Sequence, residues 1–97
     1  PDMRNTRIVD IASELKEYNC DVDIYDPWID SVEVEDEYGL RLVDELSNDK
    51  YDGIILAVAH DIFRNMGSTA IRKLGKNRHV LYDLKYILSS NESDLRL

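Results

Sequence analysis

The run Gly53-Ile-Ile-Leu-Ala-Val-Ala59 constrains the fold of this chain more than any other segment. It is apolar almost throughout and partly β-branched, which is typical of a strand that is covered on both faces. Such strands lie in the middle of parallel sheets, because the helices of the crossover connections pack on both sides. We therefore predict a central strand of a parallel sheet at residues 53–59.

The segments around this run alternate between helical and strand periods. A helix is predicted from Thr6 to Tyr18, because its apolar residues recur at i, i+3, i+4 and i+7, with Asn19 at its end. Residues 22–25 predict a strand that Asp26-Pro27 ends, since proline has no N–H for a ladder. We expect an acidic loop at 28–37, followed either by a short strand at 40–43 or by the start of a brief helix at 44–46. Two short helices are predicted at 61–66 and 68–74, with a break at Gly67 and with Gly75 at the end of the second. The last predicted strand is at 79–82.

This order predicts the α/β class, as a three-layer, Rossmann-like open parallel sheet with helices on both faces. The chain opens on a helix, whereas a doubly wound unit usually opens on a strand, so we expect that a leading strand is missing and that a longer protein carries it. A length of 97 residues fits one domain. We place this domain at residues 1–88 and expect residues 89–97 to be a frayed polar tail.

Composition narrows the classes of partner. The net charge is −8, with 20 acidic against 12 basic residues, which argues against a nucleic-acid partner. No apolar run approaches the roughly 18 residues of a membrane span, so we expect a cytoplasmic protein without a membrane partner. The single cysteine, Cys20, cannot form an internal disulfide or a cysteine-based zinc site, and no other metal-ligand spacing is found.

Four motifs in one register carry a family resemblance. They are Pro1-Asp2-x-Arg4-Asn5-Thr6, Asp23-Ile-Tyr-Asp-Pro27, Ile55-Leu-Ala-Val-Ala-His60-x-x-Phe63 and Tyr82-Asp-Leu-Lys85. From Pro1 to about Leu88 the chain resembles the C-terminal UDP-binding domain of the UDP-glucose/GDP-mannose dehydrogenase family. His60-x-x-Phe63 and Asp83-x-Lys85 are closer to the UDP-N-acetylhexosamine (glucosamine or galactosamine) 6-dehydrogenases than to UDP-glucose dehydrogenase.

The resemblance implies an NAD-dependent oxidation of the sugar C6 hydroxyl to a carboxylate, in polysaccharide-precursor synthesis. The catalytic cysteine and the main NAD-binding domain of the family lie upstream of the segment that this chain matches, so we expect the chain alone to be inactive. The implied partners are a UDP-sugar substrate, the rest of the polypeptide and a homodimer mate. Which UDP-hexose or epimer is oxidised stays open.

The resemblance also assigns roles to two residues. Arg4 is implied to bind the cofactor, although a salt bridge with Asp2 is the simpler interpretation. Lys85, just beyond the last predicted strand, is implied to bind the substrate, as a point charge that meets the diphosphate. The simpler interpretation is a surface lysine that contacts no ligand. We expect His60 to order a strand-to-helix turn, and Asp26 to cap a turn.

A second class of function stays open at this stage. An acidic α/β module with Asp26 after one strand and Lys85 after the last could be a receiver-like phosphoacceptor signalling domain. Such a domain needs an acidic pair after its first strand to hold magnesium, and no strand precedes the first helix here. A leading strand outside this chain could carry that pair, so the alternative is retained.

Overall fold

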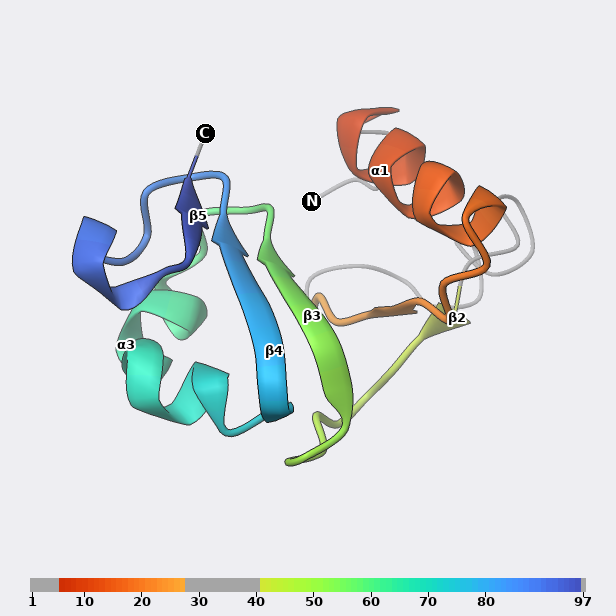
Figure 1. Cartoon of the computed structure of the whole chain (residues 1–97). Helices are drawn as coiled ribbons and strands as arrows, with labels where there is room; N and C mark the ends of the chain where they lie inside the picture. Colours follow the sequence, from red (N-terminus) through yellow and green to blue (C-terminus); the bar gives the residue numbers. More distant parts are fainter. Residues whose placement is uncertain (1–5, 28–40, 97) are drawn as a thin grey trace. The chain divides into compact units, whose positions relative to one another are not determined.

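The computed structural model describes residues 6–27 and 41–96 and divides the chain into two compact units, residues 1–46 and 47–97. Both units combine helices with parallel strands (Figure 1). The predicted α/β class is therefore confirmed. The described strands form two sheets, one in each unit, instead of the single sheet that the alternation predicts.

The first unit consists of α1 (Thr6–Glu17), β1 (Asp23–Ile24) and β2 (Arg41–Leu42). The predicted first helix is confirmed, and it ends where Asn19 adopts a left-handed φ of 65°. Ala12, 4% exposed, lies at the centre of a small core with Ile8, Val9, Val22, Ile24 and Leu42. β1 and β2 pair in parallel, so the strand predicted near 40–43 is present as Arg41–Leu42, and no helix follows at 44–46.

The second unit contains β3 (Tyr51–Leu56), α3 (Asp61–Arg72), β4 (Gly75–Asp83), the 3-10 helix η1 (Ser90–Glu92) and β5 (Leu95–Arg96). Its three strands are parallel in the order β3-β4-β5. Ile71 of α3 packs with Leu56, Leu81 and Leu88, and all four side chains are buried. The core of this unit therefore lies between α3 and one face of the sheet.

Gly67 interrupts α3 as predicted. Its φ of 76° and ψ of 164° are not helical, so two shorter helical pieces meet there at a kink. Side chains with a Cβ rarely adopt this backbone conformation. The glycine thus allows the second piece, which includes Ile71, to run in a different direction from the first.

The structure differs from the prediction for residues 53–59. Within the described residues β3 pairs only with β4 and so lies at an edge of its sheet, and Gly53 and Ile55 are exposed. Ile55, Val80 and Leu95 are 38%, 47% and 50% exposed, on the face opposite to the buried Leu81. An apolar run indicates that a strand favours burial, but it does not show which segments of the protein pack against the strand.

The expectation of a frayed tail is wrong. Residues 90–92 form η1 and residues 95–96 pair with β4, so the segment after Leu88 is structured. The domain boundary at residue 88 stays a prediction.

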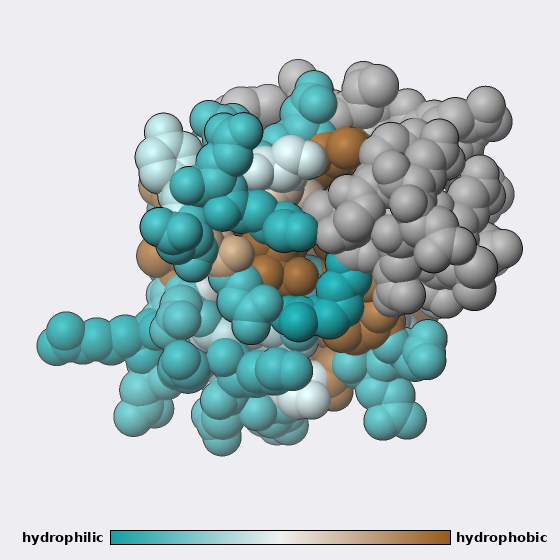
Figure 2. All heavy atoms as spheres, turned by 90° about the vertical axis from the view of Figure 1, so that its right-hand side faces the viewer, coloured by the Kyte–Doolittle hydropathy of each residue, from teal (hydrophilic) through white to brown (hydrophobic). Residues whose placement is uncertain are grey.

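In the surface view of Figure 2, apolar side chains appear in small areas among mostly hydrophilic ones. Among the described residues, no helix is both long enough and apolar enough to cross a membrane.

Candidate functional site

The carboxyl ends of the three strands of the second unit define the candidate site. The pairing register aligns Leu56 of β3 with Asp83 of β4, and Asp83 with Arg96 of β5. The segments that follow β3 and β4 therefore leave the sheet at one edge. Open α/β sheets bind ligands at this edge, because loops and helix N-termini converge there.

Asp83 organises the loop that follows β4. Its side chain is completely buried, and its Oδ1 accepts hydrogen bonds from the backbone N–H groups of Lys85 (3.2 Å) and Ile87 (3.1 Å). Its Oδ2 accepts one from the N–H of Leu88 at 2.8 Å. A buried carboxylate is tolerated when several donors satisfy its oxygens, as they do here. Asp83 consequently fixes the backbone of residues 85–88 and is unavailable to a ligand.

Lys85 lies at the predicted place, in the loop directly after β4, and it is exposed. None of the carboxylates in the described parts of the chain forms an ion pair with its ammonium group. Its backbone is held by Asp83 while its side chain can reach a ligand. The location agrees with the role that the resemblance implies, and the role itself stays a prediction.

Tyr86 follows in an unusual conformation. Its φ of 54° lies in the left-handed region, which is uncommon for an aromatic residue, and 56% of the residue is exposed. The guanidinium carbon of Arg96 lies 4.0 Å from the centroid of its ring. The loop after β4 and the end of β5 thus bring the Arg96 cation onto the ring of Tyr86, the residue that follows Lys85.

His60 begins α3 after the end of β3. Its backbone carbonyl accepts hydrogen bonds from the N–H groups of Phe63 (3.1 Å) and Arg64 (3.4 Å), and its ring lies 6.0 Å from that of buried Phe63. Its side chain does not cap the helix. This position fits the predicted structural role at the strand-to-helix turn.

The other residues singled out in the sequence lie elsewhere. Arg4, implied to bind the cofactor, is outside the described residues, and its role stays a prediction. Asp26 is buried just after β1, and Cys20 is exposed as a free thiol. Across residues 6–27 and 41–96, no group of three His, Cys, Asp or Glu side chains is arranged to hold a metal ion.

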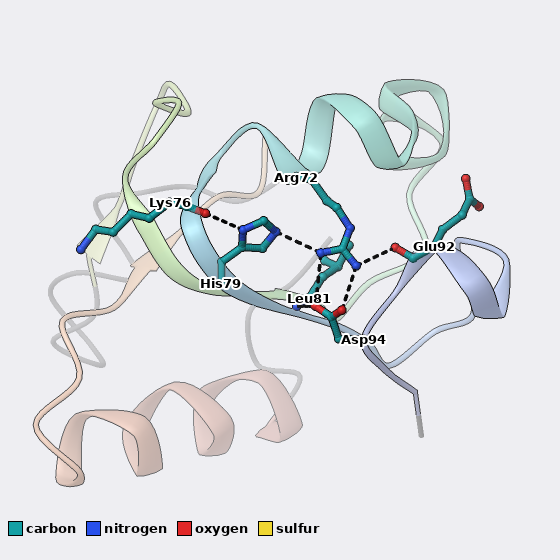
Figure 3. A network of polar contacts seen from close by, with 6 residues as sticks. All are labelled: Arg72, Lys76, His79, Leu81, Glu92 and Asp94. Atoms are coloured by element: carbon teal, nitrogen blue, oxygen red, sulfur yellow. Dashed lines mark hydrogen bonds and ion pairs between the residues drawn. The ribbon is translucent and has the colours of Figure 1, made fainter.

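Within the second unit, a network of hydrogen bonds and an ion pair joins Glu92 and Asp94 to Arg72 of α3 (Figure 3). Arg72 of α3 donates two hydrogen bonds to the carboxylate of Asp94, at 3.1 and 3.2 Å, and one to the carbonyl of Glu92 at 3.1 Å. Asp94 also accepts the backbone N–H of Leu81 at 2.8 Å. The hydrogen bonds from Arg72 and then from Leu81 lower the pKa of Asp94.

His79 and Glu92 extend this network. The Nδ1 of His79 lies 2.7 Å from the carbonyl oxygen of Lys76, and its Nε2 lies 3.0 Å from Arg72. A carbonyl only accepts and a guanidinium only donates, so these partners select the neutral imidazole with its proton on Nδ1. The carboxylate of Glu92 accepts the Ser89 backbone N–H and the Ser68 hydroxyl, both at 2.8 Å, and these two bonds, in that order, lower its pKa.

Sequence reasoning missed Tyr86, Arg96 and the Arg72–Asp94 pair. One available signal was Ser89-x-x-Glu92, the pattern of a capping box, which the structure forms at η1. That pattern predicts a helical turn where we expected a frayed tail. Nothing in the spacing of Tyr86 and Arg96 indicates that their side chains meet.

Comparison with known proteins gives a consistent result. Residues 1–90 match the family described as UDP-glucose/GDP-mannose dehydrogenase family, UDP binding domain. Over 97 residues the chain is 59% identical to the UDP-N-acetyl-D-glucosamine 6-dehydrogenase of Pseudomonas aeruginosa and 56% identical to that of Salmonella typhi, covering 100% of this chain and 23% of each relative.

A more distant relative is Protein CapL of Staphylococcus aureus, 34% identical over 92 residues, which is 95% of this chain and 22% of that protein. The chain therefore spans 23%, 23% and 22% of the lengths of the three relatives. No solved structure matches.

Proposed function

Because the chain belongs to the UDP-glucose/GDP-mannose dehydrogenase family and matches its UDP binding domain, we propose that it binds the UDP moiety of a nucleotide sugar for oxidation at C6. The observation that carries this proposal is the loop after β4. Asp83 fixes this loop from inside the fold and leaves the Lys85 ammonium exposed at the ligand-binding edge of the sheet. The receiver-like alternative is not supported, because the relatives named above are dehydrogenases.

The substrate we propose is UDP-N-acetylglucosamine. The two relatives at 59% and 56% identity carry the name UDP-N-acetyl-D-glucosamine 6-dehydrogenase. Conversion of the C6 hydroxyl to a carboxylate releases two hydrides and consumes one water molecule. NAD accepts these hydrides, and it is bound mainly by a domain other than this one. We further propose that the whole protein is cytoplasmic, works as a homodimer and serves polysaccharide-precursor synthesis.

The residues of this chain act by binding and orienting. Lys85 neutralises charge on the diphosphate, and Arg4 contacts the cofactor from the start of the chain. Contacts to the UDP moiety, remote from C6, position the reacting carbon, so that binding energy is used for orientation. Loss of such a contact should raise the substrate concentration that the enzyme requires.

Titration calorimetry with UDP and UDP-N-acetylglucosamine tests the proposal, on the full-length protein and on this chain in parallel. We expect saturable binding to the parent and about tenfold weaker binding to Lys85→Gln, which loses one charge-assisted contact. The matched control is Lys73→Gln, since Lys73 is also exposed and forms no ion pair with a described residue. Absence of UDP binding to the folded full-length protein, or equal losses in both variants, would contradict the proposal.

A further inference from the structure

We propose that Arg96, stacked on Tyr86, is a second diphosphate-binding cation beside Lys85. This inference deepens the proposed function and rests on it. Arg96 lies beyond residues 1–90, the part that matches the family, so the match does not assign it a role. The C-terminal segment then contributes to the nucleotide site directly.

The register places Arg96 at the ligand-binding edge. β5 runs parallel to β4, and Arg96 pairs with Asp83, the residue that holds the loop of Lys85 and Tyr86. The end of β5 and the loop after β4 therefore leave the sheet together. Lys85 and Arg96 therefore both lie at the carboxyl edge of the sheet.

The conformation of Tyr86 suits a binding role. Non-glycine residues with a left-handed backbone store strain and are enriched in ligand clamps. The three hydrogen bonds that Asp83 accepts in this loop maintain the conformation. Tyr86 is 56% exposed as a residue, and its ring contacts the guanidinium of Arg96. The fold thus maintains an uncommon backbone geometry that supports a cation at the surface.

Arg96 retains its capacity to bind an anion. Its guanidinium lies over an aromatic ring, and no carboxylate of the described residues pairs with it, although acidic residues outnumber basic ones 20 to 12. A guanidinium stacked on a ring keeps its N–H donors in its own plane, where they can bind two phosphate oxygens. Two cations at one edge match the two phosphoryl groups of a nucleoside diphosphate.

The Arg72–Asp94 pair holds the chain end in place. Asp94 is two residues before Arg96, and its carboxylate is bound both to Arg72 of α3 and to the backbone of Leu81 in β4 (Figure 3). The Ser68–Glu92 hydrogen bond adds a second attachment to α3. A cation that is held before the ligand arrives has less conformational entropy to lose on binding. Arg72 and Asp94 are therefore positioning residues for Arg96.

The test compares UDP, uridine and inorganic phosphate as ligands of the full-length protein. We expect Arg96→Gln to weaken UDP binding about 5- to 30-fold, as for one charge-assisted contact. Arg96→Lys should recover part of the loss, and uridine binding should not change.

Weaker inorganic phosphate binding in Arg96→Gln would show that phosphate alone is recognised. A loss confined to UDP would show that the nucleoside is also required, and both results support the proposal. Arg78→Gln is the matched control, because Arg78 is an exposed arginine of β4 without an ion pair to a described residue.

Two further measurements separate ligand binding from a structural effect. UDP affinity of the parent should fall more steeply with KCl concentration than that of Arg96→Gln, and the KM for the UDP-sugar should rise while kcat stays within twofold. If Arg96→Gln binds UDP within twofold of the parent while Lys85→Gln binds weakly, this inference is wrong and the proposed function stands. If the folded parent does not bind UDP, both are wrong.

Discussion

Replacement of Asp83 by asparagine tests the assignment of this residue as the support of the ligand-binding loop. The two side chains have the same shape, but the amide has one oxygen and one NH₂ group where the carboxylate has two oxygens. With the NH₂ group in place of Oδ2, a donor faces the buried N–H of Leu88. After a flip of the amide, the N–H groups of Lys85 and Ile87 face it instead.

The magnitude follows from these contacts. At least one buried N–H loses its partner in either orientation, which costs about 1–3 kcal/mol, and the remaining bonds lose the strength that a charged acceptor gives them. Relief of the buried charge offsets part of this loss. We expect Asp83→Asn to lower the free energy of unfolding by about 2–4 kcal/mol, out of the roughly 5–15 kcal/mol typical of a domain of this size.

Urea unfolding followed by far-UV circular dichroism measures the change, and amide hydrogen exchange locates it. The amide of Leu88 should lose more protection than the amides of α1 in the other unit. Asp52→Asn is the control, since Asp52 is exposed and forms a surface ion pair with Lys76, which contributes little. An unfolding free energy within 0.5 kcal/mol of the parent, measured with unchanged protection at Leu88, would refute the reasoning.

Three further predictions concern the same unit. Gly75→Ala should lower the free energy of unfolding by about 1–3 kcal/mol in urea, because the new Cβ would overlap with Cγ of the His79 ring; wild-type stability would show that the ring moves freely. Gly67→Ala should also lower the free energy of unfolding by about 1–3 kcal/mol, because a residue with a side chain is strained at a φ of 76° and a ψ of 164°. A lower Tm measures this loss, and an unchanged Tm would contradict the prediction. The lowered pKa values of Glu92 and Asp94, below their ordinary 4.5 and 3.8, stabilise the fold fully above about pH 5, and this contribution is lost as the pH falls through the folded values. Tm measured from pH 7 to 3 should therefore fall less in the Glu92→Gln/Asp94→Asn double variant than in the parent, and equal slopes would count against the network.

Local patterns predicted the secondary structure well. The apolar spacing of α1, the break at Gly67 and the parallel α/β class are all present. Each of these features depends on interactions between residues close in sequence, or on the conformational range of a single residue. Sequence patterns record such preferences directly.

Long-range features were harder to predict. The order of the tail depends on Asp94 meeting Arg72, 22 residues earlier, and polar residues alone do not reveal such a pair. Gly75 illustrates the same limit, because we expected it to end a helix. The structure places it in β4 with the His79 ring where its Cβ would be, so packing accounts for the glycine instead of a left-handed backbone.

The net charge alone does not describe the charges close to the candidate site. The sequence carries a charge of −8, but two carboxylates of the second unit are hydrogen-bonded within that unit. Asp83 accepts three backbone N–H groups, and Asp94 is paired with Arg72. Their lone pairs and charge are engaged by protein donors, so they do not pair with Lys85 or Arg96. Because electrostatic interactions in water are screened over about 8–10 Å, a diphosphate at this edge responds to the charges close to it, Lys85 and Arg96 among them, more than to the net charge of the whole chain.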